Sequence, residues 1–255
     1  MSKSKKRPEI YQHPELDGKN FFLEGDKDKD IGLLFIHGFT ATTVEVRKIA
    51  NYFYNNGYTV SAPLLPGHGE TPRDLNHVQL SDWINKVEES YSLLRIMKGT
   101  VIVMGESMGA LLALNLAYSH PEITKLFLFS PALEIKRLGF ARFLWPFVPY
   151  IYKKNTDESM DWQGYNVVPL HAASELLKLQ KLIINLLPRI KVPATIFLGK
   201  KDQTIILPGG VKTYDLLGSS EKELIWLEES SHCIILDKEL NKVIEMVSAR
   251  IEQKI

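Results

Sequence analysis

The chain has 255 residues, with 31 basic and 30 acidic side chains and a formal net charge of +1. This length suits one α/β domain with a sizeable core, so we expect residues 1–255 to form a single domain. The near-zero charge gives no general attraction to nucleic acid or to an anionic membrane surface, and we predict neither as a partner.

The N-terminal segment lacks the pattern of a targeting signal. Its basic side chains end at Arg7 and are followed by Pro8 and Glu9, not by the apolar run of about 7–15 residues that a secretory signal needs. No stretch reaches the roughly 18 consecutive apolar residues of a membrane span. The single cysteine, Cys233, excludes an intramolecular disulfide and fits a reducing compartment. We predict a cytoplasmic protein without stable membrane insertion.

Short apolar runs rich in β-branched residues alternate with amphipathic helical segments. Their near-continuous apolarity indicates strands that are covered on both faces. The alternation predicts an α/β fold with a mostly parallel sheet flanked by helices, in which ligands bind at the carboxyl ends of the strands. The predicted strands are Ile31–Ile36, Tyr58–Ala62, Thr100–Met104, Lys125–Phe129, Ala194–Gly199 and Glu223–Leu227.

Helical periodicity fills the segments between these strands. We expect Ser81 to cap a helix whose apolar residues recur at three- and four-residue spacing up to Leu94. The same spacing runs from Leu240 to Ile251 near the C-terminus. Gly57 and Gly99 stand where the C-terminal caps of helices are expected.

The stretch from Pro131 to Pro188 breaks the alternation. It shows no clear strand, contains a helical run at Leu176–Leu187, and is rich in large apolar residues such as Trp145. A structureless connection of this length is improbable in a compact domain. We therefore predict a small helical insertion, a cap, at about residues 131–190.

The sequence Gly105-Glu106-Ser107-Met108-Gly109 follows the predicted strand Thr100–Met104 and opens a helical run at Ala110–Tyr118. A G-x-S-x-G motif at a strand-to-helix turn exposes the serine hydroxyl above the sheet, and side chains at the glycine positions would collide with neighbouring backbone. We predict Ser107 to be a nucleophile. A glycine-rich turn with a surface serine is the alternative.

A serine nucleophile needs a base, and the base needs an orienting carboxylate, in the chain order serine, acid, histidine for this kind of fold. His120, His171 and His232 follow Ser107, and only His232 lies in a loop after a late strand. Among the intervening aspartates, Asp202 alone stands just beyond a predicted strand. We predict His232 as the base and Asp202 as its partner; the alternatives are a loop histidine and a turn aspartate with structural roles only.

The tetrahedral intermediate of acyl transfer needs two backbone donors for its oxyanion. The Met108 N–H, at a helix N-terminus, is the first candidate. The second is the Phe39 N–H, in the loop that follows the first predicted strand, where Gly38 permits the turn. Losing one such donor costs about 3 kcal/mol of transition-state stabilisation. We expect His37 and His68 to order loops, since no ligand-spaced cluster supports a metal site.

These motifs form one ordered set that spans nearly the whole chain: His37-Gly38-Phe39-Thr40, Gly57-Tyr58-Thr59-Val60, Pro63 to Gly69, Gly105 to Gly109, and the Asp202 and His232 loops. The set resembles bacterial monoacylglycerol lipases and related small carboxylesterases of the α/β-hydrolase superfamily. The resemblance implies that Phe39 and Met108 form the oxyanion hole and that the cap receives the acyl chain.

The resemblance is incomplete in the cap. After the position of Tyr165 such lipases tend to carry a glutamate that reads the glycerol hydroxyls, whereas this chain has Asn166. Asparagine can hydrogen-bond a hydroxyl but carries no charge. We expect Gly38, Trp145 and Asn166 to contact the substrate, and the alcohol group of that substrate stays open.

The sequence thus predicts a carboxylesterase that cleaves monoacylglycerols or short-to-medium acyl esters through an acyl-enzyme, without metal or cofactor. Aryl or hydroxycinnamoyl esters are an alternative because the cap is rich in aromatic residues, and carbon–carbon hydrolases and perhydrolases keep the same triad. Dehalogenases and epoxide hydrolases need an aspartate in place of Ser107. A non-catalytic ligand binder predicts a missing triad member, and none is missing. Two partners stay open for the apolar residues of the cap: a micelle, or a second subunit in a homodimer.

Overall fold

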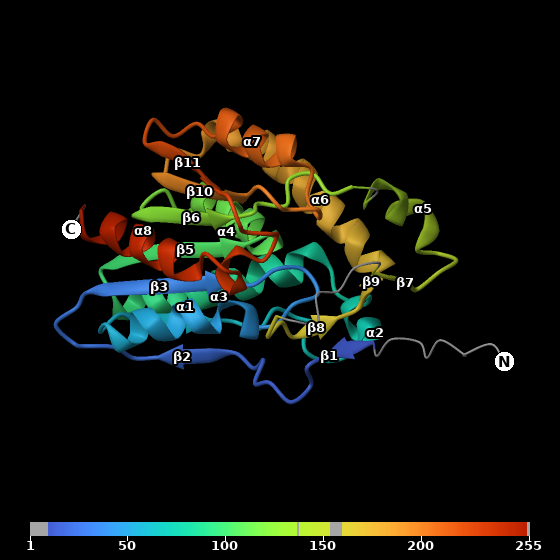
Figure 1. The fold of residues 1–255 in the computed structure, drawn as a ribbon, viewed down its shortest axis with the longest axis horizontal. Helices are drawn as coiled ribbons and strands as arrows, with labels where there is room; N and C mark the ends of the chain where they lie inside the picture. Colours follow the sequence, from blue (N-terminus) through green and yellow to red (C-terminus); the bar gives the residue numbers. More distant parts are fainter. Residues whose placement is uncertain (1–9, 137, 154–159, 254–255) are drawn as a thin grey trace.

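The computed structural model describes residues 10–136, 138–153 and 160–253, so the basic N-terminal segment lies outside the described residues. A central sheet of seven strands has the order β11-β10-β6-β5-β3-β4-β2 (Figure 1). All its neighbours pair in parallel except β2, which pairs antiparallel with β4 at one edge. The strands are β1 Tyr11–Gln12, β2 Phe21–Leu23, β3 Ile31–Ile36, β4 Thr59–Ala62, β5 Thr100–Glu106, β6 Lys125–Phe129, β7 Tyr150–Tyr152, β8 Gly164–Tyr165, β9 Val167–Pro169, β10 Ala194–Gly199 and β11 Lys222–Leu227.

Helices cover both faces of the sheet. Leu34 and Ile36 of β3 face the layer of α3, α4 and α6, whereas Leu33 and Phe35 face α1 and α8. All six residues of β3 are buried because successive side chains point to opposite, equally covered faces. The α-helices are α1 Val44–Asn55, α2 Pro72–Leu75, α3 Leu80–Met97, α4 Met108–Ser119, α5 Ala141–Leu144, α6 Leu170–Leu186, α7 Leu207–Leu216 and α8 Leu240–Glu252, and short 3-10 helices lie at Leu138–Phe140, Leu187–Arg189 and Ile234–Leu236.

The predicted mostly parallel sheet flanked by helices is confirmed. Strands β3, β6 and β10 have the predicted bounds, β4 and β11 differ by one residue at their start, and β5 extends to Glu106. Strand β2 was not predicted, because three residues are too few to show an alternating pattern.

The structure corrects the predicted start of helix α3. Ser81 is not the cap of α3: the helix begins at Leu80, and Asp82 Oδ2 accepts the Gln79 N–H at 2.8 Å. In such a capping box, the side chain at the third position of the helix accepts the backbone N–H of the residue that caps the helix, which here is Gln79. Gly57 follows α1 and has φ +83°, the left-handed conformation that ends a helix.

The cap lies between β6 and β10, at the carboxyl ends of the central strands, where Figure 1 shows α5, β7 and β9. The expectation that this segment contains no strand is wrong. Strand β7 pairs antiparallel with β9, and β8 pairs antiparallel with β1. Helix α6 starts at Leu170, six positions before the predicted Leu176. The segment predicted as a cap therefore contains helices and one small sheet of its own, β7 with β9, while its strand β8 pairs with β1 from the N-terminal part of the chain.

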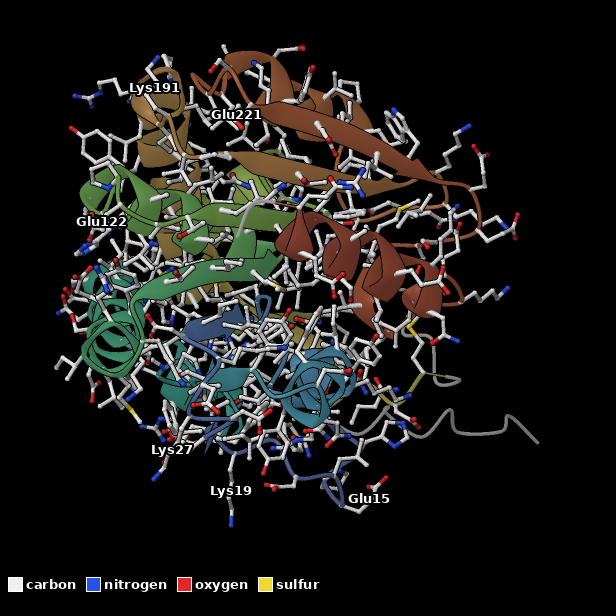
Figure 2. All side chains as sticks on the ribbon, turned by 90° about the vertical axis from the view of Figure 1, so that its left-hand side faces the viewer. Glu15, Lys19, Lys27, Glu122, Lys191 and Glu221 are labelled. Atoms are coloured by element: carbon white, nitrogen blue, oxygen red, sulfur yellow. The ribbon has the colours of Figure 1, made fainter. Side chains whose placement is uncertain are left out.

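Some charged side chains are buried, such as those of Glu45 and Asp202, whereas others are exposed on the outside of the sheet and helix layers. Figure 2 shows Lys19, Lys27 and Glu122 pointing away from the body of the protein. Within residues 10–136, 138–153 and 160–253, no helix is both long enough and apolar enough to cross a membrane.

Candidate active site

Ser107 sits on a sharp turn between β5 and α4. Its φ of 56° and ψ of −111° are unusual for a residue with a side chain, and its N–H donates to Phe129 O at 2.8 Å. The turn brings backbones into close contact: a Cβ on Gly105 would lie 2.4 Å from Gly109 C, and a Cβ on Gly109 would lie 2.1 Å from Ile36 O. Only glycine fits these two positions, and the strained backbone is held by the strand and helix on either side.

The structure brings Ser107, Asp202 and His232 together from loops that follow β5, β10 and β11. His232 Nε2 lies 2.9 Å from Ser107 Oγ, and His232 Nδ1 lies 2.7 Å from Asp202 Oδ2. The carboxyl ends of parallel strands lie at one edge of the sheet. Ser107 can therefore meet Asp202 and His232, which follow it by 95 and 125 positions in the chain. The three side chains are in hydrogen-bond contact, in the arrangement expected of a nucleophile, a base and an orienting acid.

Asp202 stays ionised in spite of its burial. Its Oδ1 accepts the Thr204 N–H at 2.7 Å and the Ile205 N–H at 3.1 Å. Burial raises the pKa of Asp202, but the His232 ring and the two backbone donors more than compensate, and the pKa lies below its ordinary value. An ionised carboxylate only accepts hydrogen bonds, so His232 Nδ1 carries the proton and Nε2 is free to accept the Ser107 hydroxyl.

The loop of residues His37–Thr40, which we call the oxyanion loop after its predicted role, connects β3 to the segment before α1. The Gly38 N–H donates to Glu45 Oε2 at 2.6 Å, and Gly38 O accepts from His37 Nδ1 at 2.9 Å and from the Ala41 N–H at 3.3 Å. The backbone hydrogen bonds of the described residues include none donated by the Phe39 or Met108 N–H. These two N–H groups are the predicted oxyanion donors.

His37 and His68 lie behind this loop. His37 Nε2 accepts the Leu65 N–H at 3.0 Å, and burial lowers the pKa of His37 to about 4. The ring is neutral near pH 7, so its Nδ1–H donates to Gly38 O. The His68 ring lies 5.0 Å from that of His37, and burial also lowers its pKa well below the ordinary value. In the part of the chain that the structure describes, no group of three or more possible ligand side chains could hold a metal ion.

Two charged residues beside the oxyanion loop were not predicted from the sequence. Glu45 is buried, and burial raises the pKa of its carboxyl group. Lys153 of the cap donates from Nζ to Thr40 Oγ1 at 2.6 Å and lies 4.5 Å from the centre of the Trp162 ring. Burial lowers the pKa of Lys153 to about 8. In a sequence, a glutamate in the first turn of a helix and a lysine just after a short strand both look like ordinary surface residues.

The cap residues that we expected to contact the substrate lie in two different places. Asn166 is buried between β8 and β9, and its backbone O accepts the Lys153 N–H at 3.0 Å. Trp145 is 43% exposed and packs edge-on against His171 at 4.9 Å. It lines a groove between α5 and α6 to which no triad residue contributes. The structure thus puts Asn166 near the oxyanion loop and Trp145 on the outer cap.

Known proteins resemble this chain along most of its length. A family model described as "Serine aminopeptidase, S33" matches residues 28–163. A thermostable monoacylglycerol lipase of Bacillus sp. (strain H-257) is 31% identical over 239 residues, which cover 92% of this chain and 94% of the relative. A carboxylesterase of Bacillus subtilis (strain 168) is 28% identical over 228 residues, or 87% of this chain and 91% of the relative. A solved structure reported with the metagenome-derived lipolytic enzymes LipS and LipT has a TM-score of 0.87 and 29% identity, covering 92% of this chain and 98% of that one.

Proposed function

Since the chain belongs to the serine aminopeptidase S33 family of α/β-hydrolases, in its monoacylglycerol lipase and carboxylesterase group, we propose that it cleaves monoacylglycerols or short-to-medium acyl esters with Ser107, His232 and Asp202 as a catalytic triad. The protein is a carboxylic ester hydrolase. The family description names aminopeptidases, but the two relatives that match over most of this chain are named for ester hydrolysis.

The observation that carries the triad is the continuous contact from Asp202 through His232 to Ser107, at 2.7 and 2.9 Å. In the proposed mechanism His232 Nε2 takes the Ser107 hydroxyl proton while Oγ attacks the ester carbonyl carbon. The Phe39 and Met108 N–H groups donate to the oxyanion. The carbonyl re-forms, and the alcohol leaves with the proton held by His232, which gives an acyl-enzyme.

Water completes the cycle. His232 takes a proton from the water, whose oxygen attacks the acyl carbon, and the collapse of the second tetrahedral intermediate returns the proton to Ser107 Oγ and releases the carboxylic acid. Asp202 holds the imidazole tautomer in both halves and stabilises the imidazolium ion. Every step uses side chains and backbone of this chain, so the mechanism needs no cofactor.

We also propose that residues 131–190 act as a cap within one domain and bind the apolar acyl group, with Asn166 facing the alcohol part. An apolar cover over a polar catalytic corner excludes water and favours hydrocarbon. Asn166 is buried near the oxyanion loop, which supports this role. Its uncharged amide can donate to and accept from a hydroxyl group.

The first test replaces the nucleophile. We expect Ser107→Ala to lower kcat for p-nitrophenyl butyrate by at least about 10⁴-fold, because the triad acts as a unit. Exposed Ser119, at the end of α4, gives a matched control, and Ser119→Ala should keep full activity and full labelling by a fluorophosphonate probe. Undiminished hydrolysis by Ser107→Ala would show that the triad assignment is wrong.

A substrate panel tests the specificity. p-Nitrophenyl esters of rising chain length, monoacylglycerols and a feruloyl ester are compared by kcat/KM. We expect the highest values for acyl esters of short-to-medium length and for monoacylglycerols. A preference for the feruloyl ester would instead favour the aryl esterase alternative.

A further inference from the structure

One buried carboxyl group contacts three segments around the candidate active site. Glu45, in the first turn of α1, accepts the Gly38 N–H on Oε2 at 2.6 Å. Its Oε1 accepts the Trp162 indole N–H of the cap at 3.2 Å and lies 3.7 Å from the Cys233 thiol. Cys233 directly follows His232. Glu45 therefore joins the oxyanion loop, the cap and the loop of the candidate base.

The contact with Gly38 bears on the direction of the Phe39 N–H. Gly38 is held at both backbone groups, at its N–H by Glu45 and at its C=O by His37 Nδ1 and the Ala41 N–H. In a planar trans peptide the N–H points opposite to the preceding C=O. With Gly38 fixed, the Phe39 N–H points away from His37 and cannot rotate freely.

The same contact sets the distance between the loop and the nucleophile. A Cβ built on Gly38 would lie 3.2 Å from Ser107 Cβ and 3.1 Å from Glu45 Oε2, so Gly38 is packed between the two side chains. A hydrogen bond from a backbone N–H to a carboxylate is among the stronger ones that a loop can form. Loss of the carboxylate would leave the Gly38 N–H buried without an acceptor, and the loop would move to satisfy it.

From this geometry we propose that Glu45 is a positioning residue of the oxyanion hole, which holds the Gly38–Phe39 segment so that the Phe39 N–H donates to the substrate oxyanion. The proposal rests on the proposed roles of Ser107 and Phe39. Glu45 does not touch the substrate; it acts through Gly38. Its bond to Trp162 means that the cap helps to hold the same carboxylate.

The test compares three substitutions at one position. Glu45→Ala removes the acceptor, Glu45→Asp withdraws it by one methylene group, and Glu45→Gln keeps a carbonyl oxygen that can still accept the Gly38 N–H. We expect Ala and Asp to lower kcat for p-nitrophenyl butyrate by roughly 10–100-fold, less than the full loss of an oxyanion donor, with KM changed by less than about threefold. Glu45→Gln should recover kcat to within about fivefold of the unsubstituted protein.

A second readout separates positioning from stability. An aliphatic trifluoromethyl ketone adds to the nucleophile and forms an oxyanion, so its inhibition constant should rise in the Ala and Asp variants by the same factor as kcat/KM falls. Asp30 gives the control: its carboxylate Oδ1 also accepts a backbone N–H, that of Gly99 at 2.6 Å, but at the amino ends of β3 and β5, the edge of the sheet opposite the candidate active site. Asp30→Ala should leave kcat and the inhibition constant unchanged, whatever its effect on Tm.

The outcomes are distinguishable. If Glu45→Ala does not fold, Glu45→Asp carries the comparison, since it keeps the charge and most of the volume. Folded Ala or Asp variants that keep the kcat and the ketone affinity of the unsubstituted protein would overturn the role of Glu45 while Ser107→Ala remains inactive. An active Ser107→Ala would instead overturn the triad itself.

Discussion

At the scale of single residues, the oxyanion loop depends on a histidine that must stay neutral. His37 accepts the Leu65 N–H on one ring nitrogen and donates to Gly38 O from the other. A protonated ring has no acceptor, so it could not keep the bond to Leu65. Burial enforces the neutral form, since it lowers the pKa of His37 to about 4.

This shift predicts a loss of stability in mild acid. The unfolded chain binds a proton at His37 near pH 6.5 and the folded chain only near pH 4, so the free energy of unfolding falls as pH drops through that window and the contribution is complete above pH 6.5. One fully buried histidine contributes about 3 kcal/mol, and His68 shifts in the same direction. Urea unfolding at pH 7, 6, 5 and 4 measures the slope.

The control for this prediction removes the titrating ring. His37→Asn should reduce the change in unfolding free energy between pH 7 and 4, whatever its effect on stability at pH 7. Equal pH slopes in the two proteins would show that His37 does not titrate in this window.

Some residues of the candidate site can be predicted from the sequence, and others cannot. Ser107, Asp202 and His232 were found because each follows a strand and their order along the chain is constrained by the chemistry. Glu45 was not, because an acidic residue in the first turn of a helix is usually a solvated partner of the helix dipole. Its burial arises only when the cap and the β11 loop fold over α1.

At the scale of elements, the turn at Ser107 depends on the close packing of β5, α4 and β3. The two glycines that flank Ser107 leave no room for a side chain. Long apolar strands such as β3 and β10 were predicted with their full bounds because they are buried on both faces. The short strands β7, β8 and β9 depend on partners distant in the sequence, and no local pattern marks them.

The packing predicts a strong contrast between two glycines. A Cβ at position 109 would lie 2.1 Å from Ile36 O, whereas a Cβ at position 139 would meet nothing within 4 Å. We expect Gly109→Ala to lower the free energy of unfolding by about 2–3 kcal/mol through forced backbone shifts. Gly139→Ala, the control, should change it by no more than about 0.5 kcal/mol. Urea unfolding of both variants gives the comparison, and equal values would contradict the packing described here.

At the scale of the whole molecule, the cap exposes a large apolar surface. Phe143 is 60% exposed and Phe147 is 84% exposed, and their neighbours Phe140, Leu144 and Trp145 are exposed as well. An exposed patch of this kind commonly marks an interaction surface. A homodimer formed through the cap stays a prediction.

Because Phe143 and Phe147 are exposed, we expect them to be dispensable for the hydrolysis of a soluble ester. A variant with Phe143→Ser and Phe147→Ser should keep kcat/KM for p-nitrophenyl butyrate within about twofold, because both side chains are exposed and the groove that Phe143 lines contains no residue of the proposed triad. A tenfold loss would show that the patch belongs to the active site. Sedimentation velocity of both proteins at rising concentration tests the homodimer, which the double substitution should dissociate.

The order of the strands along the chain determines when each residue of the candidate site is synthesised. Strands β2 to β6 can pair before Asp202 and His232 have been made, and Ser107 can occupy its turn among them. During synthesis the N-terminal part of a chain is available before the rest, although a domain generally folds as a unit. His232 is made after β11, and in the part of the chain that the structure describes a short 3-10 helix and α8 follow it. A chain that ends before β11 would therefore carry the proposed nucleophile without the proposed base, and we expect it to be inert toward esters.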